Sequence, residues 1–280
     1  MKIRITADST CDLPQELIEQ HNIQIVPLSI VKGDRSYLDG LEIVPQDIFD
    51  YVESGAGVCS TAAANLQQYM DVFQENLRSY DAVIHIGISS EFSTCVQNAR
   101  IAAEELENVY VIDSRNLSTG SGHLVLDAAL MAEQGMAASE IAAALETMTA
   151  KVEASFVLDT LKYLWKGGRC SGVTALGANI LRLKPCIEVR NGKMEVGKKY
   201  RGSIDKVLLQ YVRDRLQGRD DIDPRRIFVT CTTTSDETRQ AVEDEIRSIM
   251  HFDEIIHSRA GCTISNHCGP GTLGILFYRK

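Results

Sequence analysis

Two patterns of secondary structure meet at Asp159-Thr160-Leu161-Lys162-Tyr163-Leu164-Trp165-Lys166-Gly167-Gly168-Arg169. Before this stretch, apolar runs that are typical of buried strands alternate with segments of helical periodicity. After it, two short strand-like segments, Lys184 to Val189 and Lys193 to Val196, flank the turn Asn191-Gly192, a pattern that indicates a β-hairpin. The stretch itself follows a strand-like run, Ala154 to Leu158. We therefore expect two structural units that meet near it.

The N-terminal alternation predicts a parallel sheet with helices on both faces, because parallel strands need crossover connections. Strands are expected at Ile3 to Ala7, Ile23 to Ile30, Ala82 to Ile88 and Val109 to Ile112. Helices are expected at Glu16 to His21, Pro45 to Glu53, around Leu66 to Phe73, in a segment ending at Ala103, and in two stretches up to about Val152. The predicted first domain is a Rossmann-like α/β unit, residues 1–155.

The C-terminal part predicts a mixed sheet, because a hairpin is followed by strands that alternate with helices. The expected helices are Ser203 to Leu216, with Ser203 as N-cap, and Asp236 to Met250; the expected strands are Ile227 to Cys231, Glu254 to His257 and Thr272 to Tyr278. The predicted fold class is therefore α/β with two domains, the second being a mixed α/β domain at residues 156–280.

Composition and charge narrow the class of protein. The chain has 280 residues, a net charge of −9 and 44% hydrophobic residues, which is typical of a globular protein and argues against nucleic-acid binding. A strand-like segment directly after Met1 and the absence of an apolar run of about 20 residues predict neither a signal peptide nor a membrane span. Eight scattered cysteines without a Cys-x-x-Cys pair favour reduced thiols and a cytoplasmic location.

The positive charge is concentrated in one region. Residues 160–206 contain 11 lysines and arginines against 3 acidic residues, a balance of +8, so the rest of the chain carries −17. Such a division favours a surface that meets an anion or an anionic partner. The alternative is a short amphipathic helix whose lysines are only solvated.

Small polar residues follow three of the predicted N-terminal strands: Asp8-Ser9-Thr10, Ser89-Ser90 with Ser93, and Asp113-Ser114. Ligands of open parallel sheets bind at this edge, although helix caps and turns have the same residue types. Ser93 is the sharpest candidate, because it falls where a helix begins and free backbone N–H groups favour an anion.

The segment Gly269-Pro270-Gly271-Thr272-Leu273-Gly274 matches the G-x-G-x-x-G dinucleotide pattern in the wrong context, since a strand and not a helix follows it. We expect these glycines to let the backbone approach a ligand or another strand closely. His267, just before them, is then a candidate for a polar ligand contact. Cys262, His267 and Cys268 match no zinc spacing, so no metal site is predicted.

No motif of an activated nucleophile or a phosphate loop is present, which favours a binding protein without a cofactor. The alternative is a stand-alone enzyme that acts on a small anionic or phosphorylated metabolite through Ser93 and His267. A sensor or interaction module has less support, since no tail for partner binding is apparent.

The chain resembles the DegV family in a set of landmarks that occur in family order from end to end. These are Asp8-Ser9-Thr10-Cys11-Asp12-Leu13-Pro14, Asp113-Ser114, Asp159 to Leu164 leading to Gly167-Gly168-Arg169, Lys184-Pro185, Arg201-Gly202 and His267 to Gly274. The resemblance implies a bacterial cytoplasmic protein that binds a long-chain fatty acid between two α/β domains. It also implies a partner, the catalytic subunit of an ATP-dependent fatty acid kinase, to which the lipid is presented for acyl phosphate formation.

Carried over by residue, the resemblance implies that Thr61, Ser93 and His267 hold the carboxylate. The sequence departs from the family pattern at Thr61-Ala62-Ala63-Ala64 and Phe92-Ser93-Thr94-Cys95, where each lead hydroxyl remains and a polar neighbour is lost. Arg169 and Arg201 are expected at the mouth of the site, in contact with the kinase or its phosphates. The same basic rim would suit a transient contact with an anionic membrane surface.

Overall fold

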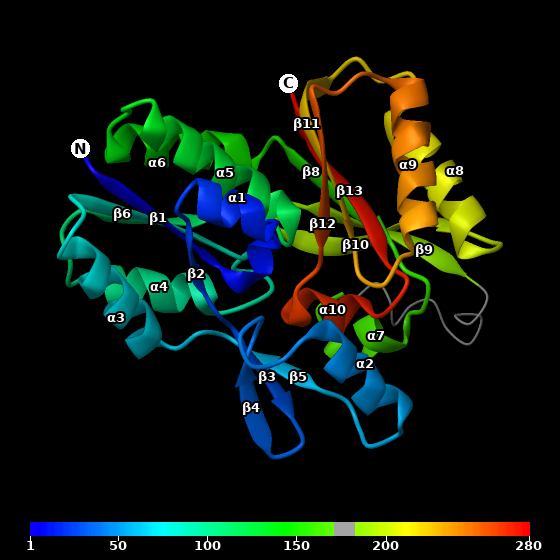
Figure 1. Ribbon diagram of the computed structural model, residues 1–280, viewed down its shortest axis with the longest axis horizontal. Coiled ribbons are helices and arrows are strands. Elements are labelled where there is room, and N and C mark those ends of the chain that lie inside the picture. The colour runs from blue at the N-terminus through cyan, green and yellow to red at the C-terminus, as the bar shows by residue number, and fades with distance from the viewer. Residues whose placement is uncertain (171–182) are drawn as a thin grey trace.

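The computed structural model describes residues 1–170 and 183–280 (Figure 1). The N-terminal part forms a parallel sheet in the order β2 (Gln24–Val26), β1 (Ile3–Asp8), β6 (Ala82–Gly87) and β7 (Val109–Asp113). Strand β6 is buried along its whole length, which explains why its sequence lacks polar alternation. One face carries α3 (Leu66–Leu77) and α4 (Cys95–Ala103), and the other carries α5 (Thr119–Glu133) and α6 (Ala138–Thr149). This confirms the predicted parallel unit.

The second sheet is mixed, as predicted. Its strand order is β10 (Lys193–Tyr200), β9 (Lys184–Arg190), β8 (Val152–Val157), β13 (Leu273–Arg279), β11 (Ile222–Cys231) and β12 (Glu254–Arg259). Only the pair β11–β12 is parallel among its described pairs. Helices α8 (Ile204–Leu216) and α9 (Asp236–Ile249) cover the outer face (Figure 1). The hairpin turn has φ of 50° at Asn191 and 81° at Gly192, the conformation that these residue types favour.

Helix α5 lies between the two large sheets and contacts strands of both. Its residues from 119 to 129 are all buried, so it has no solvent-facing side over three turns. Close packing depends on Gly122, where an added Cβ would lie 2.7 Å from the backbone oxygen of Cys11. Side chains from both sheets, such as Ile84 and Phe156, join Leu124 of α5 in one continuous hydrophobic core.

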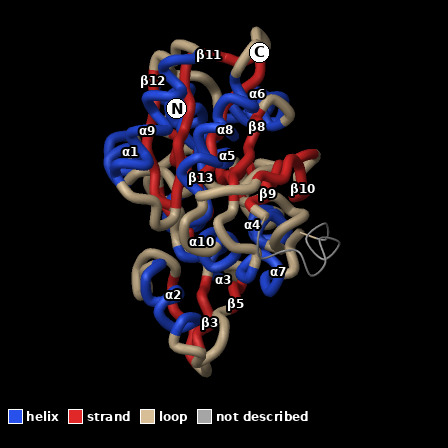
Figure 2. The backbone as a smooth tube through the Cα atoms, turned by 90° about the vertical axis from the view of Figure 1, so that its right-hand side faces the viewer, coloured by secondary structure: helices blue, strands red, loops and turns tan. Residues whose placement is uncertain are grey.

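A third, small antiparallel sheet consists of β4 (Arg35–Leu38), β3 (Ser29–Lys32) and β5 (Ser60–Ala62), and helix α2 (Pro45–Glu53) lies beside it. Figures 1 and 2 show this sheet at one end of the molecule, with α10 (Cys262–Cys268) between it and the larger sheets. The other short elements are the 3₁₀ turn η1 (Ser9–Cys11), α1 (Gln15–Gln20) and α7 (Lys162–Gly167).

The structure differs from the sequence predictions at several points. The strand expected at Ile23 to Ile30 is two strands in different sheets, β2 and β3, because Pro27 between them cannot donate to a sheet ladder. Strands β4 and β5 and helix α10 were not predicted. The helical stretch expected to run to about Val152 ends at Thr149, and Val152 begins β8.

The division into residues 1–155 and 156–280 stays a prediction. Its boundary falls inside β8, which is hydrogen-bonded to β9 and β13 of the six-stranded sheet. The basic region 160–206 includes residues 171–182, which lie outside the described residues.

Candidate functional site

The polar residues at the strand ends hold the loops of the site in place. Asp8 is fully buried and accepts hydrogen bonds from Tyr69 Oη (2.6 Å) and from the backbone N–H of Ile88 (2.8 Å). Asp113 similarly accepts from Ser90 Oγ (2.6 Å) and from the backbone N–H of Arg115 (2.9 Å). Both carboxylates therefore fix the loops that follow β6 and β7. Asp113 acts as the turn residue that the sequence left open, whereas Asp8 makes no cap hydrogen bond to the helical turn that follows it.

Asp39 of the small sheet's loop holds the beginning of α10. Its carboxylate accepts from the backbone N–H groups of Cys262 (2.8 Å) and Thr263 (3.0 Å) and from Thr263 Oγ1 (2.6 Å). A carboxylate at this position satisfies free N–H groups and suits the positive end of the helix dipole. The Asp39 carboxylate also accepts a hydrogen bond from Ser9 Oγ (3.0 Å), which connects α10 to the end of β1. The cap fixes the helix that carries His267 in its last turn.

His267 contacts Thr61 across the gap between α10 and β5. The distance between His267 Nε2 and Thr61 Oγ1 is 2.9 Å. Burial, with the positive charge of Arg169 as a smaller cause, lowers the pKa of His267 to about 4, so the imidazole is neutral at pH 7. Its Nδ1 is enclosed and has no hydrogen-bond partner among the described residues. A Cβ on Gly167 would lie 2.2 Å from this Nδ1, so α7 reaches the ring only because position 167 is glycine.

Thr61, Ser93 and His267 line one cavity of about 60 Å³. Ser93 belongs to the loop between β6 and α4, where its Oγ lies 3.1 Å from Cys95 Sγ and accepts from the backbone N–H of Cys95. The rest of the wall is mostly apolar: Leu28, Ala62, Ala63, Ile88, Phe92, Leu117, Met194, Ile264 and Cys268, with Thr263 and Arg169. The cavity thus combines three polar side chains with a mostly apolar wall, near the carboxyl ends of the parallel strands.

A second cavity of about 20 Å³ continues the apolar interior toward the six-stranded sheet. It shares Leu117, Ile264 and Cys268 with the first cavity and reaches Phe156 and Leu276, which lie on β8 and β13. The two cavities are therefore neighbours, separated by these shared side chains. Sequence reasoning missed Leu117 and Ile264, because an apolar residue that faces a cavity has the same sequence signature as a core residue.

Arg169 and Arg201 occupy different surroundings. Arg169 is exposed and lines the site cavity as well as a neighbouring opening of about 50 Å³, on the side of His267 that faces Lys162 and Lys166. Arg201 is also exposed, follows β10 and lines none of these three cavities. The structure therefore brings Arg169, but not Arg201, to the wall of the candidate site.

The glycine-rich segment allows close packing, as expected. Gly269 has φ of 78°, and a Cβ there would lie 2.5 Å from the ring of Tyr163. Gly274 lies against strand β8, where a Cβ would be 2.6 Å from the backbone oxygen of Ser155. Strand β13 follows the segment, so the dinucleotide-binding interpretation is excluded by the local fold.

The geometry does not arrange a catalytic pair. Ser93 Oγ is next to Cys95, whereas His267 Nε2 is next to Thr61, so the serine and the imidazole do not form the hydrogen-bonded pair of an activated nucleophile. Within residues 1–170 and 183–280, no group of three or more His, Cys, Asp or Glu side chains converges as metal ligands would. In the same residues, every helix is too short or too polar to cross a bilayer.

The fold and the site define an α/β protein with a mostly apolar cavity whose wall includes two hydroxyls and an imidazole. The family model of DegV, described as a family of uncharacterised proteins, matches residues 2–280. The chain belongs to the DegV family.

Relatives and solved structures resemble the chain over its whole length. A DegV domain-containing protein of Caldanaerobacter subterraneus is 33% identical and covers 100% of this chain and 99% of its own. One similar solved structure concerns the fatty acid binding of a DegV family protein from Thermus thermophilus. It is 32% identical to this chain, has a TM-score of 0.90 and covers 100% of both chains. A stearic acid-binding protein from Eubacterium ventriosum is 25% identical with a TM-score of 0.84 and covers 99% of this chain and 98% of its own.

Proposed function

We propose that this protein binds a long-chain fatty acid, with the carboxylate at Thr61, Ser93 and His267 and the acyl chain in the apolar interior. One observation carries the proposal: three polar side chains from distant parts of the sequence line one cavity whose remaining wall is mostly apolar. The fatty acid binding of the similar solved structures supports the same ligand class.

The chemistry of a fatty acid matches this division. Each buried CH₂ group contributes about 0.8 kcal/mol, so the chain supplies most of the affinity. A buried carboxylate is costly unless donors meet it, and two hydroxyls, a neutral imidazole and the nearby charge of Arg169 are suitable. The cavities are smaller than a long acyl chain, so binding requires wall side chains to move apart; Met194 is well suited because its side chain adapts easily.

We further propose that the protein is not itself an enzyme and presents the lipid to a separate ATP-dependent kinase that forms the acyl phosphate. Arg169 at the cavity wall is the expected contact for the kinase or its phosphates, and Arg201 is a more distant member of the same basic rim. Because ATP supplies the phosphoryl group, the proposed location is the cytoplasm. Helix α7 exposes Trp165 (57%) beside Lys162 and Lys166, a surface that suits transient contact with an anionic membrane.

Lipid extraction tests the central proposal. The purified protein is expected to release about one fatty acid per chain on denaturation, as measured by mass spectrometry of the extract. Protein stripped of lipid should take up a saturated or unsaturated fatty acid of about 16 to 18 carbons, a length whose apolar burial supports tight binding. A chain that stays empty after incubation with both would contradict fatty acid binding.

A further inference from the structure

A cavity of about 710 Å³ is separate from the site above and shares no wall residue with it. It lies between the end of α6, the loop after β7, the β9–β10 turn and strand β8 of the six-stranded sheet. Its volume is in the range of small-molecule sites. Five arginines line it: Arg115, Arg190, Arg215, Arg219 and Arg279.

Only two carboxylates, Glu153 and Glu188, belong to the same wall, so the wall carries an excess of positive charge in a chain of net charge −9. Three carboxylates outside the wall offset this formal excess: Asp221 pairs with Arg219, and Glu91 and Asp113 pair with Arg115. Arg190 and Arg279 have the most exposed side chains of the five arginines, at 62% and 48%. Arg190 donates to Glu188 from Nε (3.1 Å) and Nη2 (2.7 Å), and Arg279 Nη2 donates to the Ala150 carbonyl (2.6 Å). Guanidinium groups at a cavity wall suit anion binding.

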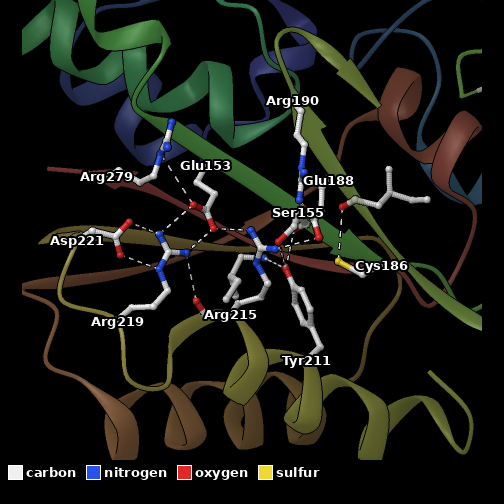
Figure 3. A network of polar contacts seen from close by, with 12 residues as sticks. Glu153, Ser155, Cys186, Glu188, Arg190, Tyr211, Arg215, Arg219, Asp221 and Arg279 are labelled. Carbon is white, nitrogen blue, oxygen red and sulfur yellow. Dashed lines mark hydrogen bonds and ion pairs between the residues drawn. The ribbon is translucent and has the colours of Figure 1, made fainter. Parts of the chain in front are cut away.

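Glu153 is the centre of the arginine cluster (Figure 3). It accepts hydrogen bonds from Arg215 and, at 2.7 Å and 3.1 Å, from Arg219, while Arg279 Nε lies 4.0 Å away. One carboxylate thus faces three guanidinium groups, of which Arg219 also pairs with Asp221. Arg215 is also paired with Glu188 (3.1 Å), yet its buried Nε–H lacks a hydrogen-bond partner in the described part of the chain.

The glutamates hold the arginine side chains in fixed positions, which reduces the entropy lost when a ligand binds. Guanidinium forks match phosphate oxygens in a bidentate geometry, and several forks around one cavity suit a group with several negative oxygens. We propose that this cavity binds a small metabolite that carries a diphosphate or similarly multivalent phosphate group. The site is separate from the lipid cavity, and its ligand contacts the exposed guanidinium groups of Arg190 and Arg279, in competition with the hydrogen bonds that these groups make to Glu188 and Ala150.

The test uses the full-length protein and inorganic pyrophosphate as the probe, with binding measured by calorimetry at one low salt concentration. The wild-type protein is expected to bind one equivalent saturably. The double variant Arg190→Ala/Arg279→Ala should lose affinity by about tenfold or more, the ratio expected for one charge-assisted hydrogen bond. The control is Arg247→Ala, an arginine of similar exposure (57%) on α9, paired with Glu243 outside the cavity; its affinity should equal that of the wild type.

Three results would overturn the proposal: no saturable binding by the wild type, equal binding by the double variant, or citrate binding as tightly as pyrophosphate. The last would assign the cavity to polycarboxylates. Thermal unfolding checks that the double variant folds. If it does not fold, the single variant Arg190→Ala replaces it in the binding test, because Arg190 is the more exposed of the two arginines. Arg279→Lys, which keeps the charge but not the fork, should bind more weakly than the wild type. Fatty acid content should be unchanged in all variants, so the result is independent of the lipid proposal.

Discussion

Thr61 and His267 are joined by a hydrogen bond of 2.9 Å although 206 residues separate them in the chain. The bond connects β5 of the small sheet to the last turn of α10, and both side chains line the apolar cavity. The two groups are therefore paired with each other at the cavity wall.

Replacing Thr61, Ser93 or His267 by Ala is expected to weaken fatty acid binding. In the proposed binding mode each change removes a hydrogen bond to a charged carboxylate, worth about 1.5–3 kcal/mol, so the Kd should rise by about 10- to 150-fold. Titration of lipid-free protein with a fluorescent fatty acid measures this. Ser248→Ala on the exposed face of α9 serves as the control. Unchanged Kd values in all three variants would mean that the carboxylate binds elsewhere.

Gly167→Ala should disturb the site more than Gly168→Ala. A Cβ at Gly167 would lie 2.2 Å from His267 Nδ1, so the ring or α7 must move, at a cost of roughly 1–3 kcal/mol. At Gly168 the space is open, and Ala there meets only the strain of φ = 66°, roughly 1–2 kcal/mol. Both variants should lose stability in denaturant titrations, but only Gly167→Ala should also lose fatty acid affinity. Equal losses of affinity would contradict the role of Gly167.

The free energy of unfolding should fall as the pH is lowered, because His123 lies in the buried helix α5. Burial, with the nearby charges of Arg226 and Arg225, lowers the pKa of His123 to about 3. The unfolded chain takes up this proton near pH 6.5 and the folded chain does not, so the free energy of unfolding falls by about 1.4 kcal/mol per pH unit between these values.

His123→Gln isolates this contribution. Glutamine retains an N–H that can donate to the Leu276 carbonyl, which His123 Nε2 contacts at 2.9 Å, but it does not titrate in this range. Urea unfolding at pH 7, 6 and 5 should show the difference between wild type and variant shrinking as the pH falls. Parallel pH profiles would show that His123 binds its proton equally in both states.

Arg169→Ala should reduce kinase-dependent acyl phosphate formation more than fatty acid binding, because Arg169 is exposed at the cavity wall. Arg201→Ala should have a smaller effect, since Arg201 lies outside the wall. The two assays are a fatty acid titration and the rate of acyl phosphate formation with an added kinase. Loss of fatty acid binding alone in Arg169→Ala, or no effect on either assay, would count against a docking role.

Local sequence signals were sufficient for most of the fold. Strand β6 is predicted by its apolar run, and the β9–β10 hairpin by Asn191-Gly192, because both depend on residues within a few positions. Helix α10 could not be predicted in this way. It has only seven residues, includes β-branched Thr263 and Ile264, and is capped by Asp39, which is 223 residues from Cys262.

The candidate site was accessible from the sequence only in part. Ser93 follows from its place after a strand and before a helix, His267 from its place before the glycine-rich segment, and the resemblance added Thr61. Their common cavity depends on α10 bringing His267 to β5, a tertiary relation that no short pattern contains. The arginine cavity was also not predicted, because Arg115 and Arg279 lie 164 positions apart and converge only through the two sheets.

Helix α5 makes the two large sheets one folding unit. Because its buried residues contact both sheets, neither sheet can separate from it without exposing apolar surface of the shared core. Heat or denaturant should therefore unfold the chain in a single cooperative transition, with equal calorimetric and van't Hoff enthalpies. A gene fragment that ends near residue 155 would retain α5 without β13 and β9, and its exposed helix face would favour aggregation over independent folding.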